Sequence, residues 1–302
     1  MNIDRMKNLL FELCSVPSIS ETPGEIEMAE KIYETVMKMD YFKNNPANAE
    51  INPIKNDPFG RYYVHALMEG KPESKKTVIL LSHFDVVNVE DYGTYKDYAF
   101  KPLEYTELLK KGSGISLSKE AEMDLASGDY IFGRGIMDMK FGLALDVEIM
   151  HQIENKLDNF PGNILLLSVP DEENNSAGML ASVEMLAALK NEKGLEYVCC
   201  IVSEPHFPKY PGDSSKYIYT GAVGKLLPVF YCVGKETHAG DPFSGLNPNL
   251  LTAKIIEKIE LNPELSDVSA SFMTPAPVCL KQSDTKNSYS VSTPAAAYSY
   301  FN

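Results

Sequence analysis

Three consecutive carboxylates, Asp171, Glu172 and Glu173, lie in the stretch SVPDEENNSAGML, shortly after the apolar run NILLL. Adjacent like charges repel one another and lower stability unless a positive charge lies against them. A solvated helix N-terminus is the simpler explanation, because the helix dipole favours acidic side chains there. The arrangement of the other polar residues in the chain favours a bound cation instead.

Polar side chains follow three apolar runs at the point where each run ends. VILLS leads into His83 and Asp85, NILLLSV leads into the three carboxylates, and VCCIVS leads into Glu204. In open parallel sheets, ligands bind beyond the carboxyl ends of the strands. We therefore expect one imidazole and several carboxylates to meet at one edge of a sheet.

A fourth stretch, GDYIFGRGIMDMKFG, places Asp138 between Gly135 and Gly142 in a glycine-rich turn before a helix. It lacks the G-K-[ST] ending of a P-loop and matches G-x-G-x-x-G poorly. Its central aspartate would also repel a phosphate. One imidazole nitrogen and several carboxylate oxygens suit Zn²⁺, or a related ion such as Co²⁺ or Mn²⁺.

His83 and Asp85 are two residues apart, so on a continuing strand their side chains point to the same side. The carboxylate of Asp85 could then hold the second ring nitrogen of His83 and select its tautomer. An isolated histidine here would more simply be a core residue; the neighbouring carboxylates favour a ligand. His65 and His151 carry no predicted role, and His206, in a loop near the site in sequence, is not predicted to be a ligand.

The elements that must position these residues alternate between strand-like and helix-like runs. Helices are expected at the N-terminus, after Pro23 and Gly24, and over residues 140–157, 176–194 and 248–261; strands are expected over residues 61–70, 75–84, 163–169 and 196–205. Residues 90–130 are expected to form a long surface excursion. Continuous apolar strands alternating with helices predict an α/β fold with a mainly parallel sheet and helices on both faces.

The character of the chain changes near Gly221, where YIYTGAVGKLLPVFYCVG predicts longer, more exposed antiparallel strands. The last stretch, NSYSVSTPAAAYSYFN, consists of strand-type residues and then stops. The sequence therefore predicts two domains, at residues 1–220 and 221–302.

Composition excludes several classes of protein. The 302 residues carry a formal net charge of -14, which argues against a nucleic-acid partner and an anionic membrane surface. No apolar run approaches the roughly 20 residues that span a bilayer, and the N-terminus does not resemble a signal peptide. Five cysteines without a C-x-x-C pair predict reduced core residues in a cytoplasmic protein.

Four motifs, LSHFDVV, GRGIMDMKFG, VPDEENNSAGM and VSEP, occur in an order and at separations that resemble the M20 family of metallopeptidases and amidohydrolases. The stretches ETPGE, EDYGTYKDYAF and GKETHAGDPFSGLNPN resemble its arginine-utilisation (RocB-type) branch. The resemblance covers essentially the whole chain. Any one of the four short motifs would be weak evidence, but together they are specific.

The resemblance implies a role for each metal-site residue. His83 would bind one metal ion and Asp85 would orient it. Asp138 would bridge two ions. Glu173 would bind the ion that His83 does not, and Glu204 would complete the His83 site.

The same resemblance implies that Glu172 is the general base and acid, which fits the chemistry of adjacent glutamates: one faces the metal and the other the substrate. His238, in ETHAGDP, would stabilise the oxyanion, often in the active site of the partner subunit. A turn or capping histidine remains the alternative for His238. An acidic helix N-terminus remains the less favoured alternative for the glutamate pair.

The resemblance also implies a zinc-aminopeptidase-like catalytic domain at residues 1–220 and a smaller α+β lid domain at 221–302 that often forms homodimers. The family needs one more metal-binding histidine late in the chain, and none follows His238. Two classes of function remain open. The chain is either an N-terminal portion, with an incomplete lid domain, of a zinc-dependent hydrolase of small amino-acid-derived amides or peptides, for which the branch suggests a role in arginine catabolism, or an inactive metal-binding or partner-binding protein with half a site.

Overall fold

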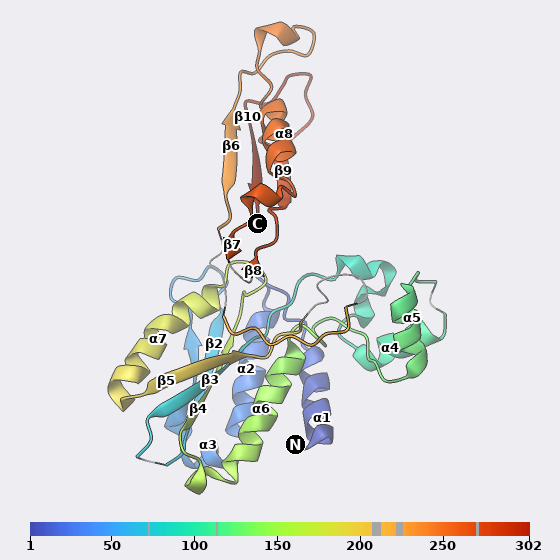
Figure 1. Cartoon of the computed structure of the whole chain (residues 1–302). Coiled ribbons are helices and arrows are strands. Elements are labelled where there is room, and N and C mark those ends of the chain that lie inside the picture. Colours follow the sequence, from blue (N-terminus) through green and yellow to red (C-terminus); the bar gives the residue numbers. More distant parts are fainter. Residues whose placement is uncertain (72, 113, 207–212, 222–225, 270–271) are drawn as a thin grey trace. The chain divides into compact units, whose positions relative to one another are not determined.

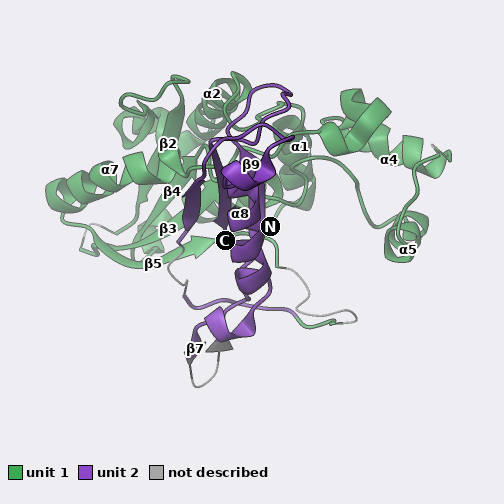
Figure 2. Cartoon of the chain, turned by 90° about the horizontal axis from the view of Figure 1, so that it is seen from above, with its two compact units in different colours: residues 1–215 green, residues 216–302 purple. Residues whose placement is uncertain are grey.

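The computed structural model describes all residues except 72, 113, 207–212, 222–225 and 270–271. The chain divides into two compact units, Met1–Ser215 and Lys216–Asn302 (Figures 1 and 2). No helix among the described residues is long and apolar enough to cross a bilayer. Each unit has its own sheet, so each is described by itself.

The first unit is built around a five-stranded sheet in the order β1-β2-β4-β3-β5 (Figure 1). The strands are β1 (Ala49–Pro53), β2 (Tyr62–Glu69), β3 (Lys76–His83), β4 (Asn163–Val169) and β5 (Glu196–Val202). Strands β4, β3 and β5 are parallel neighbours, whereas β1 and β2 join them through antiparallel pairings. The predicted α/β class is confirmed, and the sheet is mixed.

Helices cover both faces of this sheet (Figure 1). The helices of the unit are α1 (Ile3–Cys14), α2 (Gly24–Met37), α3 (Asp40–Asn44), α4 (Pro102–Lys110), α5 (Lys119–Ser127), α6 (Lys140–Glu154) and α7 (Ala177–Lys193). Apolar side chains of α1, α2 and α6 form one core cluster with the sheet, and those of α7 pack against a second cluster on the opposite face. All seven residues of β4 are buried, as its continuous apolar sequence predicts.

The predicted surface excursion over residues 90–130 contains more regular structure than its polar sequence indicated. A 3-10 helix, η2 (Glu90–Tyr98), precedes α4 and α5. Pro102, Thr106 and Leu109 form the buried side of α4. Short amphipathic helices of this kind present only a few apolar residues each, so the sequence pattern is weak.

The second unit contains a three-stranded antiparallel sheet in the order β6-β10-β9 and the α-helix α8 (Pro248–Ile259). Its strands are β6 (Val229–Val233), β9 (Cys279–Asp284) and β10 (Ala296–Phe301), with a separate short pair, β7 (Val268–Ser269) and β8 (Phe272–Met273). The helix was predicted within two residues of its observed ends. Of the longer strands predicted over residues 217–234, only β6 is present: residues 217–221 and 226–228 are not in strands, and residues 222–225 lie outside the described part of the chain.

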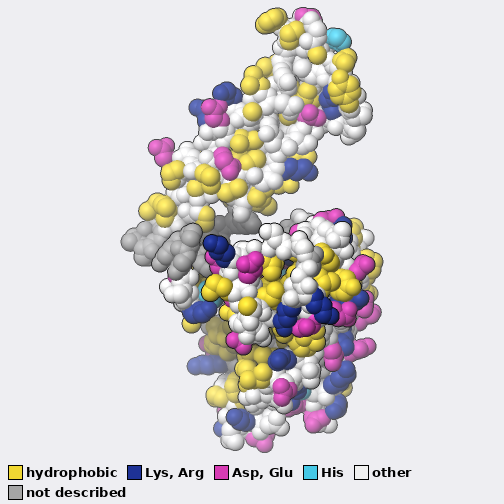
Figure 3. Space-filling view, turned by 90° about the vertical axis from the view of Figure 1, so that its right-hand side faces the viewer, with side chains coloured by type: hydrophobic (Ala, Val, Ile, Leu, Met, Phe, Trp, Pro, Cys, Tyr) yellow, Lys and Arg dark blue, Asp and Glu magenta, His cyan; other side chains and the backbone are white. Residues whose placement is uncertain are grey.

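One face of this small sheet contacts α8 and the other carries exposed apolar side chains. Gln282 of β9 donates a hydrogen bond to Thr252 of α8 (2.8 Å). Val229, Tyr231 and Val233 alternate along β6 and are all more than half exposed. Figure 3 shows hydrophobic side chains spread over the visible surface of this unit.

The cysteine prediction was only partly right. All five cysteines are free, as predicted, and Cys14 is buried in the core. Cys199 and Cys200, however, are exposed on β5, and Cys232 and Cys279 are half-buried. The reason is the place of β5 at the edge of the sheet, where apolar sequence does not guarantee cover on both faces.

Candidate metal centre

The register of three parallel strands brings their ends to the same edge of the sheet. His83 of β3 lies opposite Val169 of β4, and Leu81 of β3 lies opposite Val202 of β5. The chain therefore leaves the sheet at neighbouring points just before Glu172 and just before Glu204. This local geometry follows from the apolar strands, each of which ends where polar residues begin.

His83 lies at the centre of the site and is buried, with 2% of its surface exposed. Its Nδ1 lies 3.1 Å from the carbonyl oxygen of Asp85 and 3.4 Å from the Asp85 carboxylate. Its Nε2 lies 3.2 Å from Asp138 Oδ1 and 3.3 Å from Glu204 Oε1. Asp85 therefore contacts the ring at Nδ1, and Nε2 on the opposite side of the ring faces the carboxylates of Asp138 and Glu204.

Asp85 also holds the loop that carries the two adjacent glutamates. Its Oδ1 accepts the backbone N–H of Glu172 (3.0 Å) and its Oδ2 accepts the backbone N–H of Glu173 (3.2 Å). The hydroxyl of Ser20 donates to the same carboxylate at 2.7 Å. One fully buried side chain therefore orients both the imidazole and the glutamate loop.

The glycine-rich turn places Asp138 immediately before α6. Gly135 has a φ of +75°, and a Cβ at this position would lie 3.0 Å from the side chains of Val86 and Lys140, so glycine is needed there. The Asp138–Met139 peptide bond is cis. Lys140 is completely buried and its Nζ donates to the carbonyl oxygen of Val16 (2.8 Å), which ties the start of α6 to the segment after α1.

The carboxylates shift the protonation equilibria of the site. Burial opposes charge on His83, but hydrogen bonds to Asp138, Asp85 and Glu204 outweigh burial and raise its pKa to about 12. Burial and the neighbouring Asp138 raise the pKa of Glu173 to about 6. Without an ion, the imidazolium is the positive charge that balances the cluster. A bound cation would have to displace that proton, because a metal ligand must be deprotonated.

A divalent cation fits the donor set at the centre. Single donor atoms of His83, Asp138 and Glu173 all lie within 4.8 Å of one another. The carboxylate of Glu172 lies 3.9 Å from His83 Nε2, and about half of its side-chain surface is exposed. The cluster thus offers an imidazole and carboxylates around one point, with a further carboxylate that faces the solvent.

Neither His238 nor His206 is among the described donors of this cluster. His238 belongs to the Lys216–Asn302 unit, is exposed, and accepts the backbone N–H of Gly240 at Nδ1 (3.0 Å). Its role at the cluster stays a prediction. His206 is half-buried and is not among the donors that lie within 4.8 Å of one another.

The sequence analysis missed several supporting residues. Arg61 pairs with Asp171 and so supplies a positive charge to the first of the three consecutive carboxylates. Ser20 binds Asp85, and Asp146 of α6 accepts the hydroxyl of Ser203, the residue before Glu204. Ser203 lies within the motif VSEP and Ser20 directly precedes ETPGE, but none of these residues has a diagnostic spacing.

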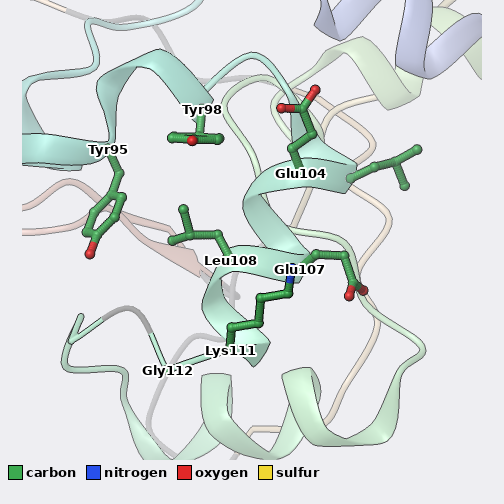
Figure 4. Close-up of a pocket in the computed structure, with 8 residues that line it drawn as sticks. Tyr95, Tyr98, Glu104, Glu107, Leu108, Lys111 and Gly112 are labelled. Carbon is green, nitrogen blue, oxygen red and sulfur yellow. The ribbon is translucent and has the colours of Figure 1, made fainter.

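A separate cavity of about 580 Å³ lies on α4 and η2. Its described lining residues include none of the candidate ligands. Figure 4 shows Tyr95, Tyr98 and Leu108 lying toward one another, whereas the carboxylate of Glu107 points away. Glu107 binds the neighbouring Lys110 (2.9 Å), and Glu104 and Lys111 also line the cavity.

Comparison with known proteins identifies the family. Residues 116–295 match the family model described as peptidase family M20/M25/M40. The chain belongs to the M20 peptidase family. The M20 segment begins before the glycine-rich turn and includes Asp138, the glutamate loop and Glu204.

Two M20-type relatives from Bacillus subtilis (strain 168) match over 99% of the chain. The uncharacterized protein YqjN is 41% identical and the protein RocB is 38% identical, each over 299 residues. The chain spans about half the length of these relatives, 53% of YqjN and 52% of RocB. The likeness to RocB agrees with the predicted branch of the family.

A solved structure supports the fold. The chain is similar to the M20 family metallo-carboxypeptidase Sso-CP2 from Sulfolobus solfataricus, with a TM-score of 0.60 and 17% sequence identity. The match covers 99% of this chain and 70% of that chain. At this identity the likeness concerns the fold alone.

Proposed function

We propose that this chain forms part of a zinc-dependent hydrolase that cleaves an amide or peptide bond of a small amino-acid-derived substrate. The observation that carries the proposal is the convergence of His83, Asp138 and Glu173 within 4.8 Å at the ends of parallel strands in an M20 family member. An imidazole and carboxylates are the donors that Zn²⁺ takes in catalytic sites, and Co²⁺ or Mn²⁺ would fit the same donors.

Under this proposal His83, Asp138 and Glu204 hold one metal ion, and Asp138 and Glu173 contribute to a second. The contacts of His83 Nε2 with Asp138 (3.2 Å) and Glu204 (3.3 Å) support the first set. Asp85 contacts His83 Nδ1, so Nε2 is the ring nitrogen that would bind the metal ion. The second set lacks an imidazole within this chain, since no histidine follows His238.

Glu172 is the proposed proton carrier. A bound divalent ion makes water acidic enough to lose a proton near neutral pH and polarises the scissile carbonyl. The Glu172 carboxylate takes the proton from the attacking water and returns it to the nitrogen of the leaving amine. Its pKa is raised by burial and by the nearby carboxylates Glu204 and Asp85, although His83 acts in the opposite direction, so it holds a proton more readily than an ordinary glutamate.

The two units take different roles in this proposal. Residues 1–220 would form the catalytic metal-binding domain, and residues 221–302 part of a lid that forms homodimers. His238 of the lid would stabilise the developing oxyanion, in its own site or in the partner subunit's. The exposure of His238 is compatible with this role.

Arginine breakdown is the proposed metabolic setting, and the cytoplasm the proposed compartment. The 38% identity to RocB over 99% of the chain supports a substrate derived from arginine or a related amino acid. The net charge of -14 is compatible with such a cationic substrate. Neither a nucleic acid nor a membrane is proposed as a partner.

The test uses the protein as its gene encodes it. Zinc content is measured after dialysis, and hydrolysis is assayed with N-acetylated amino acids and arginine-containing dipeptides. Glu172→Gln is expected to retain zinc and fold but to lose hydrolysis by about 10³-fold or more, as expected for a lost proton carrier in a metal site. Glu120→Gln, an exposed glutamate on α5, is the matched control. Near-normal turnover by Glu172→Gln would contradict the assignment.

An inactive metal-binding or partner-binding protein is the alternative function. Such a protein would bind zinc at His83 and would hydrolyse none of these substrates. The half-exposed carboxylate of Glu172, 3.9 Å from His83 Nε2, favours the hydrolase, because a purely structural site is normally closed by its ligands.

A further inference from the structure

We infer that Arg61 is a positioning residue of the metal centre, acting through Asp171 on the loop that carries Glu172 and Glu173. The inference rests on the proposed function, since it concerns how the same site is held. Arg61 lies just before β2 and its side chain is 3% exposed. Nothing in the metal-ligand set touches it directly, so its effect on the site must pass through another residue.

The guanidinium of Arg61 is held by residues of its own turn, independently of its contact with the glutamate loop. Its Nε and Nη2 donate to the carboxylate of Asp57, with the shortest contact at 2.7 Å, and its backbone N–H donates to the same side chain at 2.8 Å. The Phe59 ring lies 4.9 Å from the guanidinium carbon. This arrangement leaves Nη1 as the donor that faces away from the turn of residues 57–61.

Nη1 of Arg61 contacts two fully buried carboxylates. It lies 2.7 Å from Asp171 Oδ1 and 3.4 Å from Glu25 Oε2. Glu25 is itself held, because Oε2 accepts the backbone N–H of Glu21 at 2.6 Å. Removing one partner from such a buried set leaves the others without compensation, so the position of Asp171 depends on Arg61.

Asp171 in turn closes the loop that carries the glutamates. Its Oδ2 accepts the backbone N–H of Ala177, the first residue of α7 (3.0 Å), and its carbonyl oxygen accepts that of Ser176 (2.6 Å). The backbone of Asp171 has a φ of +70°, a left-handed conformation that is uncommon outside glycine, although aspartate adopts it more readily than most residues, and the contacts of Asp171 stabilise it here. Arg61 provides the ionic contact.

The loop is therefore fixed from two sides. Asp85 holds the backbone N–H groups of Glu172 and Glu173 on the side of the metal centre. Arg61 and Asp171 hold the opposite end, next to the start of α7. With only the first restraint, the glutamate carboxylates could still rotate away from His83, and a metal site tolerates little such displacement.

The simpler explanation is a buried ion pair that affects stability alone. The zinc affinity distinguishes a positioning role from a purely stabilising one. A residue that only stabilises the fold leaves zinc binding intact well below the unfolding temperature. Zn²⁺ affinity is measured for residues 1–302 by competition with a chromophoric chelator, beside the thermal midpoint. The variants are Arg61→Met, the charge-preserving Arg61→Lys, and the control Arg5→Met, which removes a remote ion pair with Glu148.

Arg61→Met is expected to weaken Zn²⁺ affinity about tenfold, because the loop that Arg61 holds through Asp171 carries Glu173, one of the three donors that lie within 4.8 Å of one another. Arg61→Lys is expected to fall between Arg61→Met and the wild type, and it provides the readout if Arg61→Met does not fold. Arg5→Met should leave affinity unchanged. Adding Asp171→Asn to Arg61→Met should weaken affinity no further, because both changes break the same link.

Two outcomes would overturn the inference and leave the proposed function intact. One is a folded Arg61→Met or Arg61→Lys variant with wild-type zinc affinity. The other is full additivity in the double variant, which would show that Arg61 does not act through Asp171. Failure of the wild-type chain to bind zinc would instead overturn the proposed function, and the inference with it.

Discussion

Asp85→Ala should reduce both the stability of the metal-free chain and its affinity for zinc. Asp85 is fully buried and accepts hydrogen bonds from Ser20 and from the backbone N–H groups of Glu172 and Glu173. Its pKa is lowered because hydrogen bonds from His83 and Ser20 outweigh its burial, so the carboxylate is ionised near neutral pH. The variant removes every one of these acceptors at once.

The magnitude follows from the donors left behind. The hydroxyl of Ser20 also lies 3.4 Å from the carbonyl oxygen of Val86 and can turn to it. The N–H groups of Glu172 and Glu173 have no such second acceptor in the described hydrogen bonds. A fully buried donor without a partner costs about 1–3 kcal/mol, and these two groups are only part-buried, so together they cost about 2–4 kcal/mol. Removing a buried charge offsets part of this, which leaves a loss of about 1–3 kcal/mol.

Urea unfolding of the metal-free chain near neutral pH measures this loss, and chelator competition measures the fall in zinc affinity, which we expect to be about 10–100-fold. Asp129→Ala, at an exposed site on the loop after α5, is the control. Asp85→Asn should be milder than Asp85→Ala, since its amide oxygen can keep one of the two N–H groups. An unfolding free energy of Asp85→Ala within about 0.5 kcal/mol of the wild type would refute the reasoning, because surface substitutions change stability by that much.

Two further predictions concern the pH dependence of stability. Glu148 is held by Arg5, Asn2 and Gln152, and these hydrogen bonds outweigh its burial and lower its pKa to about 2. Its contribution is therefore present above its unfolded pKa of about 4.3 and is lost as pH falls towards 2, and Glu148→Gln should remove this part of the acid dependence of urea unfolding. Burial raises the pKa of Asp146 to about 7, so the folded state binds a proton that the unfolded state has released, and stability should fall as pH rises from about 4 to 7. Asp146→Asn should flatten thermal midpoints over that range, and an unchanged slope would contradict this account.

Strand ends were the part of the site that could be predicted from sequence. An apolar run such as NILLLSV followed by carboxylates marks where a buried strand leaves the core, and that information is local. The parallel pairing of β3 with β4 and β5 then brings His83, the glutamate loop and Glu204 to the same edge. The α/β class and most helix positions followed from the same periodicities.

Long-range polar contacts could not be predicted in this way. Arg61 and Asp171 are far apart in sequence, and an arginine before a strand is ordinarily a surface residue. Lys140 reads as a solvated residue at the start of a helix, yet it is completely buried against the carbonyl oxygens of Leu13 and Val16. Only the packing of α6 against α1 makes that side chain part of the core. The apolar pattern of a single strand likewise cannot show whether other elements will pack over both of its faces. For this reason Cys199 and Cys200 of β5 were wrongly predicted to lie in the core.

The open position of β5 has a practical consequence for oligomerisation studies. This strand lies at one end of the five-stranded sheet, and Val198, Ile201 and Val202 are each about half exposed. An edge strand with free backbone groups and apolar side chains is a template on which a strand of another molecule can pair. Concentrated samples of residues 1–302 should therefore self-associate through β5. A dimer seen by light scattering would not by itself identify the Lys216–Asn302 unit as the contact, and a charged substitution at Ile201 would separate the two kinds of dimer.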